Sequence, residues 1–86
     1  MSSVAAGQLL KVWAHRLEMN RKGITKEWTP SLRTAVECLV EKLKTIPPGE
    51  GVSIDADIDR DPIARFIRVA TGEIIGEINL APEARI

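Results

Sequence analysis

Apolar residues recur at helical spacing in two stretches of the first half of the chain. In residues 4–21 the apolar face consists of Ala6, Leu10, Trp13 and Leu17. In residues 30–45 it consists of Leu32, Val36, Leu39 and Leu43. Thr29 and Pro30 mark the start of the second stretch, because Thr is a good N-cap residue and Pro suits the first helical position. We therefore predict two helices, over residues 4–21 and 30–45, with residues 1–3 frayed.

The second half of the chain changes to an alternation of apolar and polar residues, which is typical of half-buried antiparallel strands. Turn residues divide it into three strands, over residues 52–58, 63–70 and 73–80. The predicted fold is therefore α+β: two N-terminal helices packed on one face of a three-stranded antiparallel β-meander, in a single domain of residues 1–86.

The dipeptide Thr71-Gly72 predicts a two-residue hairpin loop, because Gly supplies the positive φ that such a loop requires. This loop sets Val69 opposite Ile74 and thereby fixes which side chains share a face. The set predicted to lie under the helices is Ile63, Ile67, Val69, Ile74 and Ile78. The other face carries Phe66, Arg68, Ile75 and Glu77, and these four are the predicted partner-binding residues.

The charge balance excludes some classes of function. Twelve basic and twelve acidic residues give a net charge of zero, whereas general nucleic-acid binding needs a basic surface. The cations near the first helix form only a modest strip: Lys11, Arg16, Arg21, Lys22 and Lys26. No apolar run approaches the length of a membrane span and no secretory signal is recognisable. The single cysteine suits a reducing compartment, so a cytoplasmic location is expected.

No set of residues has the pattern of a catalytic or metal site. Asp55, Asp57, Asp59 and Asp61 alternate as at the start of a calcium loop, but the Gly and the bidentate Glu that such a loop needs are missing in both possible registers. His15 has no second ligand at a suitable spacing, and Cys38 has no base beside it. We expect a protein that is not an enzyme and that uses no cofactor, metal or small-molecule substrate.

The hairpin of residues 63–78 resembles the core of the FlaG family of bacterial flagellar proteins. The matching features are a basic residue at Arg65 within an apolar strand, the turn Thr71-Gly72-Glu73, the pair Ile74-Ile75 and the closing Glu77-Ile78. The likeness covers about residues 36–78, and the chain departs from the family pattern at Arg68, Ala70 and Asn79. It implies a small non-catalytic protein that affects flagellar filament assembly through protein contacts. It also leaves export through a flagellar-type system open, because such export uses no cleavable signal.

Two functions follow as expectations. One is a FlaG-like accessory factor of the bacterial flagellum, and the other is a self-associating structural or adaptor domain of an unrelated bacterial system. Both are protein-interaction modules, whose partner is another protein or a second copy in a homodimer. A chain of 86 residues has only a thin core, so pairing with a second copy would add stability.

Overall fold

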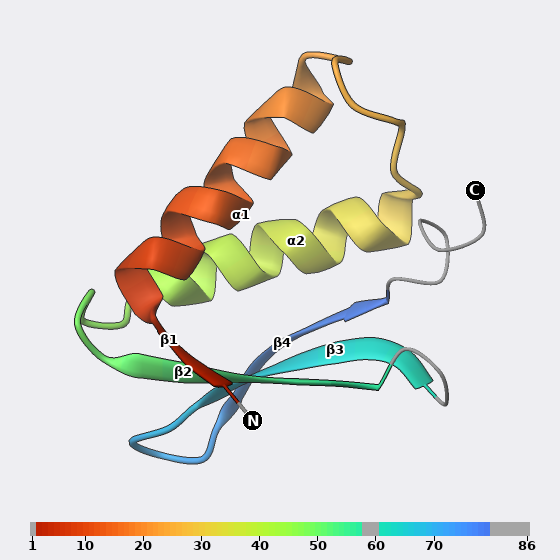
Figure 1. Ribbon diagram of the computed structural model, residues 1–86. Helices are drawn as coiled ribbons and strands as arrows, with labels where there is room; N and C mark the ends of the chain where they lie inside the picture. Colours follow the sequence, from red (N-terminus) through yellow and green to blue (C-terminus); the bar gives the residue numbers. More distant parts are fainter. Residues whose placement is uncertain (1, 58–60, 80–86) are drawn as a thin grey trace.

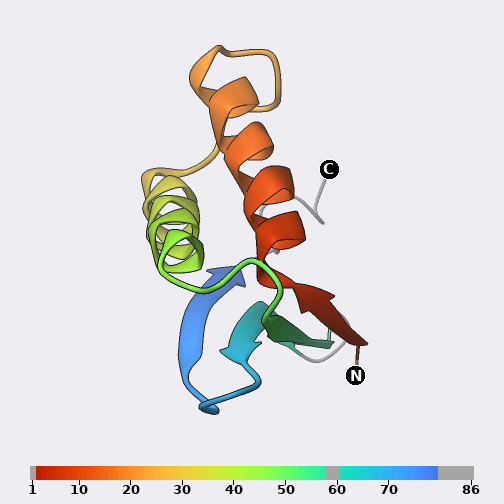
Figure 2. The same cartoon turned by 90° about the vertical axis from the view of Figure 1, so that its left-hand side faces the viewer.

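The computed structural model describes residues 2–57 and 61–79 of the chain (Figure 1). The described elements, in chain order, are β1 (Ser2–Ala5), α1 (Ala6–Arg21), α2 (Pro30–Lys44), β2 (Gly51–Asp57), β3 (Asp61–Arg68) and β4 (Ile74–Asn79). The strands form one antiparallel sheet in the order β1-β2-β3-β4. Both helices lie on the same side of that sheet, as Figure 2 shows.

The predicted α+β class, with two helices on one face of an antiparallel sheet, is confirmed. The sheet has one strand more than predicted, because β1 pairs with β2 from Ser2 opposite Ile54 to Ala5 opposite Gly51. The expectation that residues 1–3 are frayed is therefore wrong for Ser2 and Ser3. Met1 lies outside the described residues.

The start of α1 is capped by the loop that precedes β2. The N-cap residue Ala5 has no side chain that can accept a hydrogen bond. Instead, the N–H groups of Ala6 and Gly7 donate to the backbone oxygens of Glu50 and Pro48, at 2.8 and 3.0 Å. These bonds satisfy two of the donors that every helix leaves unpaired at its N-terminus. The close approach depends on Gly7, because a Cβ there would lie 2.9 Å from Cβ of Pro48.

An ion pair holds the same loop on the sheet. The guanidinium of Arg68, at the end of β3, donates from Nε and Nη2 to the two carboxylate oxygens of Glu50, both at 3.0 Å. Both side chains are largely shielded from solvent. This two-pronged geometry is the strongest form of the arginine–carboxylate contact, so the cap on α1 is connected to β3.

The second helix follows its prediction closely. Thr29 is the N-cap, and its hydroxyl accepts a hydrogen bond from the Leu32 N–H at 3.2 Å. The buried stripe of α2 consists of Leu32, Val36, Leu39, Val40 and Leu43. This stripe packs on β4 and on α1, while α1 stands away from most of the sheet (Figure 1).

A single buried polar residue, Asn20, fixes the connection between the helices. Its side-chain amide donates to the Lys26 carbonyl at 2.9 Å, and its oxygen accepts from the Arg33 guanidinium at 3.0 Å. Asn20 is 6% exposed and is the one buried polar or charged residue in the described ranges. The amide thus links the end of α1 to the connection and to the first turns of α2.

The β3–β4 hairpin differs from its prediction in loop length and register. The loop has four residues, 69–72, because the Arg68 N–H donates to the Glu73 carbonyl and Gly72 takes the positive φ of 74°. Ile67 lies opposite Ile74, but Phe66 lies opposite Gly76. Ile75 is therefore an extra residue in β4, a β-bulge in which Ile75 and Gly76 together oppose Phe66. The predicted pairing of Val69 with Ile74 is wrong.

The shift changes which side chains face the helices. The buried side chains of the sheet are Val52, Ala64, Phe66, Ile75 and Ile78. Of the predicted core set, only Ile78 is buried, whereas Val69 and Ile74 are 58% and 50% exposed. Trp13 of α1 contributes to the core from the helix layer. Its ring packs edge to face on the ring of Phe66, with the two ring centroids 5.8 Å apart.

We expect Gly76→Ala to lower the free energy of unfolding by about 1–2 kcal/mol, the low part of the usual range for overpacking a core. The new Cβ would lie 2.9 Å from Cδ1 and 3.3 Å from Cβ of Leu39, whose side chain is fully buried. The matched control is Gly49→Ala, since no atom lies within 4 Å of the added group, and its effect should stay below about 1 kcal/mol. Urea unfolding measures the free energy of unfolding of both variants. Equal losses of stability would contradict the contact between Leu39 and β4.

Candidate functional site

The side of the sheet that faces away from the helices carries a group of aliphatic side chains. The alternation of β3 and β4 places Ile63, Ile67 and Ile74 there. Val69, the first residue of the hairpin loop, continues this group beside Gly51 of β2, and the structure leaves all four aliphatic residues partly or largely exposed. None of the described elements lies on that side of the sheet (Figures 1 and 2). We call these four residues, with Arg65 and Glu77 between them, the open sheet face.

Rows of side chains run across the open sheet face from strand to strand. In one row Ile67 of β3 lies opposite Ile74 of β4. In the next row Arg65 lies opposite Glu77, and Asp55 of β2 lies on the other side of Arg65. The Nε of Arg65 is 3.7 Å from Oε1 of Glu77, and both side chains remain exposed, at 36% and 51%. An apolar row is therefore bordered by a row that carries both signs of charge.

The structure separates the four predicted partner-binding residues. Phe66 and Ile75 are 2% and 5% exposed and belong to the core under the helices, so the prediction that they lie on an accessible face is wrong. Arg68 is on their side of the sheet and is engaged by Glu50. The hydrogen bond to Glu50 raises the pKa of the Arg68 guanidinium above its ordinary value. Glu77 alone lies on the open sheet face.

Part of the error lies in the register of the hairpin. A two-residue loop and a regular ladder would group Ile67 and Ile74 with Ile78, which does lie under the helices. The observed register and the bulge place Ile67 and Ile74 on the face opposite to Ile78. The sequence did contain a signal for the bulge. Gly76 stands inside a strand, and such a glycine often marks a bulge or a close backbone approach.

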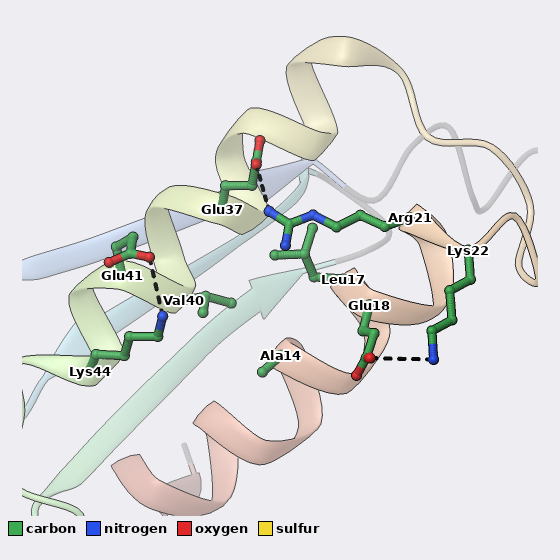
Figure 3. A pocket seen from close by; sticks show the side chains of 9 residues that line it. All are labelled: Ala14, Leu17, Glu18, Arg21, Lys22, Glu37, Val40, Glu41 and Lys44. Atoms are coloured by element: carbon green, nitrogen blue, oxygen red, sulfur yellow. Dashed lines mark hydrogen bonds and ion pairs between the residues drawn. The ribbon is translucent and has the colours of Figure 1, made fainter.

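A groove with a volume of about 580 Å³ lies between α1 and α2 (Figure 3). Its apolar floor consists of Ala14, Leu17 and Val40. Its rim carries three acidic and three basic side chains, which form the ion pairs Arg21–Glu37, Lys22–Glu18 and Lys44–Glu41. Because every rim charge already has a partner of opposite sign, the groove favours no particular charged ligand.

The residues considered for catalysis or metal binding do not come together. His15 is exposed on α1 and Cys38 is exposed on α2. Within residues 2–57 and 61–79, no group of three or more His, Cys, Asp or Glu side chains could hold a metal ion. Asp55 is exposed, while Asp59 and the side chains of Asp57 and Asp61 lie outside what the structure describes.

The basic strip near α1 is partly engaged by other groups. Arg21 and Lys22 belong to the ion pairs of the groove. The Arg16 guanidinium lies over the Trp13 ring, with its carbon 5.1 Å from the ring centroid, in the geometry of a cation–π contact. Three of the five basic side chains of the strip are therefore already in contact with other side chains of the same chain.

Comparisons with protein-family models, with curated proteins and with solved structures find no match to this chain. The resemblance to the FlaG family therefore stays a prediction. None of the helices in the described ranges is long and apolar enough to cross a membrane. The open sheet face is the candidate site that the geometry supports best.

The neighbouring residues Ile74 and Ile75 provide a direct test of the two faces. Ile75→Ala should lower the free energy of unfolding by about 2–5 kcal/mol, the usual range for a buried isoleucine. Ile74→Ala should change it by less than about 1 kcal/mol, because the side chain is half exposed. Thermal and urea unfolding of both variants measure the difference. A larger loss of stability for Ile74→Ala than for Ile75→Ala would support the two-residue hairpin loop and would contradict the bulge.

Proposed function

We propose that this domain is a non-catalytic protein-interaction module that binds another folded protein through its open sheet face. The observation that carries the proposal is the placement of four aliphatic side chains on the side of the sheet opposite the helices. Removal of apolar surface from water contributes roughly 25 cal/mol per Å², so a partner that covers these side chains gains free energy from each of them.

The composition of the open sheet face suits a protein partner. Its centre is apolar, at Ile67 and Ile74, and charged residues lie beside that centre at Arg65 and Glu77. An apolar centre with polar surroundings is the usual arrangement of a protein interface. The helix groove offers a weaker case, because its apolar floor is bordered by charges that pair with each other.

The two expectations from the sequence share this mode of action. A role in flagellar filament assembly and a role as a self-associating domain both require a surface that binds protein. The open sheet face supports their common element, binding through protein contacts. The flagellar assignment rests on the sequence resemblance of residues 36–78 alone, and the proposal does not depend on it.

Site-specific photo-crosslinking in the cells that produce the protein tests this proposal. A benzophenone amino acid replaces Ile74 in one variant and Val12 in the control variant, since both residues are exposed aliphatics, at 50% and 44%. Irradiation should join a protein to position 74 and not to position 12, because only the first belongs to the open sheet face. Adducts at neither position, or equal adducts at both, would refute the proposal.

A further inference from the structure

We propose that the occupant of the open sheet face is a second copy of this chain, packed sheet against sheet across a two-fold axis. This inference rests on the proposed function and deepens it by naming the partner. The axis lies between the two sheets, parallel to the strands, and runs midway between β3 and β4. It brings β3 of each copy over β4 of the other.

The pairing of rows within one sheet makes this arrangement complementary to itself. Ile67 and Ile74 lie opposite each other in one row, and so do Arg65 and Glu77 in the next. A two-fold axis between the strands exchanges the members of each pair, as an isologous contact requires. Arg65 of one copy then faces Glu77 of the second copy, and Glu77 faces Arg65.

The apolar row pairs with itself in the same way. Ile67 meets Ile74 of the second copy and Ile74 meets Ile67, so four isoleucines form the centre of the contact. Aligned packing of two sheets, about 10 Å apart, is a common way to bury two such faces. The four charges border this centre and form two intermolecular ion pairs in addition to the one that each copy makes internally at 3.7 Å.

The charges of the chain favour a second copy over a strongly charged partner. Twelve basic and twelve acidic residues leave each copy with no net charge, so two copies do not repel each other at long range. Within the two overlapping strands, Arg65 and Glu77 likewise carry one charge of each sign, while Asp55 of the same row lies on β2, outside the overlap. A partner that presents a single sign of charge to the overlap would attract one of these two side chains and repel the other, whereas a second copy presents a charge of opposite sign to each.

The contact area sets the expected strength of the dimer. The overlap involves two strands, and the six residues of β4 extend over about 20 Å at a rise of ~3.3 Å per residue. Such an overlap buries less than roughly 1,200 Å², the size of weak and transient interfaces. We therefore expect a dissociation constant at or above the micromolar range rather than an obligate dimer.

Sedimentation equilibrium of the full chain, from about 1 μM to about 1 mM, tests the proposal over the range of weak affinities. The wild type should shift from monomer to dimer within this range. Arg65→Glu and Glu77→Arg each place like charges opposite one another and should weaken the dimer at least tenfold. Lys11→Glu, an exposed reversal on α1, is the matched control and should leave dimerisation unchanged. Circular dichroism confirms that each variant is folded.

Mixing the two variants provides the decisive measurement. The Arg65→Glu chain carries carboxylates at both positions of the row, and the Glu77→Arg chain carries guanidinium groups at both. In an equimolar mixture these opposite charges face each other, so the mixture should regain the dimer that each variant alone has lost. The ion pair within each chain stays broken in the mixture, so recovery reports contacts between chains. Failure of the mixture to recover, or a dimer that Arg65→Glu leaves intact, would overturn this arrangement.

The proposal and the interaction function fail in different ways. A wild type that stays monomeric to about 1 mM overturns the second copy as occupant. The interaction function would then still stand if position 74 crosslinks to a different protein. An adduct of position 74 with twice the mass of the chain supports both. Absence of any adduct at that position overturns both.

Discussion

The arrangement of this molecule depends on one extra residue in β4. Successive side chains of a regular strand point to opposite faces, so Ile75 and Ile78 could not both face the helices in a regular ladder. The bulge opposite Phe66 resets the alternation, and both isoleucines become buried. It also turns Gly76 toward the helices, where the missing side chain leaves room for Leu39. The bulge thereby determines how closely α2 lies on the sheet and which aliphatics stay outside.

A second set of contacts connects the first helix to this sheet, although α1 itself touches little of it. The loop before β2 accepts hydrogen bonds from the first N–H groups of α1 and is held by the Arg68 side chain through Glu50. Arg68 follows Ile67 in β3 and therefore points to the opposite face, the one that the helices cover. Because Arg68 ends β3 where the hairpin loop begins, the hairpin register also determines how α1 is anchored.

The sequence predicted the features that depend on neighbouring residues. Thr29 and Pro30 fix the start of α2 by local hydrogen bonding and a preset φ, and the structure agrees with both. The alternating pattern located the three meander strands to within about two residues, the usual uncertainty of element ends. The short β1 was missed because Ser2–Ala5 carries no alternation long enough to detect, and its pairing depends on β2, which lies far along the chain. The cap on α1 was missed for the same reason, because its acceptors are the distant carbonyls of Pro48 and Glu50. The N-cap residue Ala5 has no side chain that could have indicated it.

The candidate site was predicted on the wrong face because isoleucines occur on both sides of the hairpin. Hydrophobic patterning decides register only when one face is clearly more apolar, and here Ile63, Ile67 and Ile74 compete with Phe66, Ile75 and Ile78. Packing resolves the competition: Phe66 meets Trp13 edge to face, and Gly76 admits Leu39. Once those contacts fill the core, the remaining aliphatics do not contribute to it. Their substitution should therefore leave the fold intact, so variants of the open sheet face test the proposed binding separately from folding.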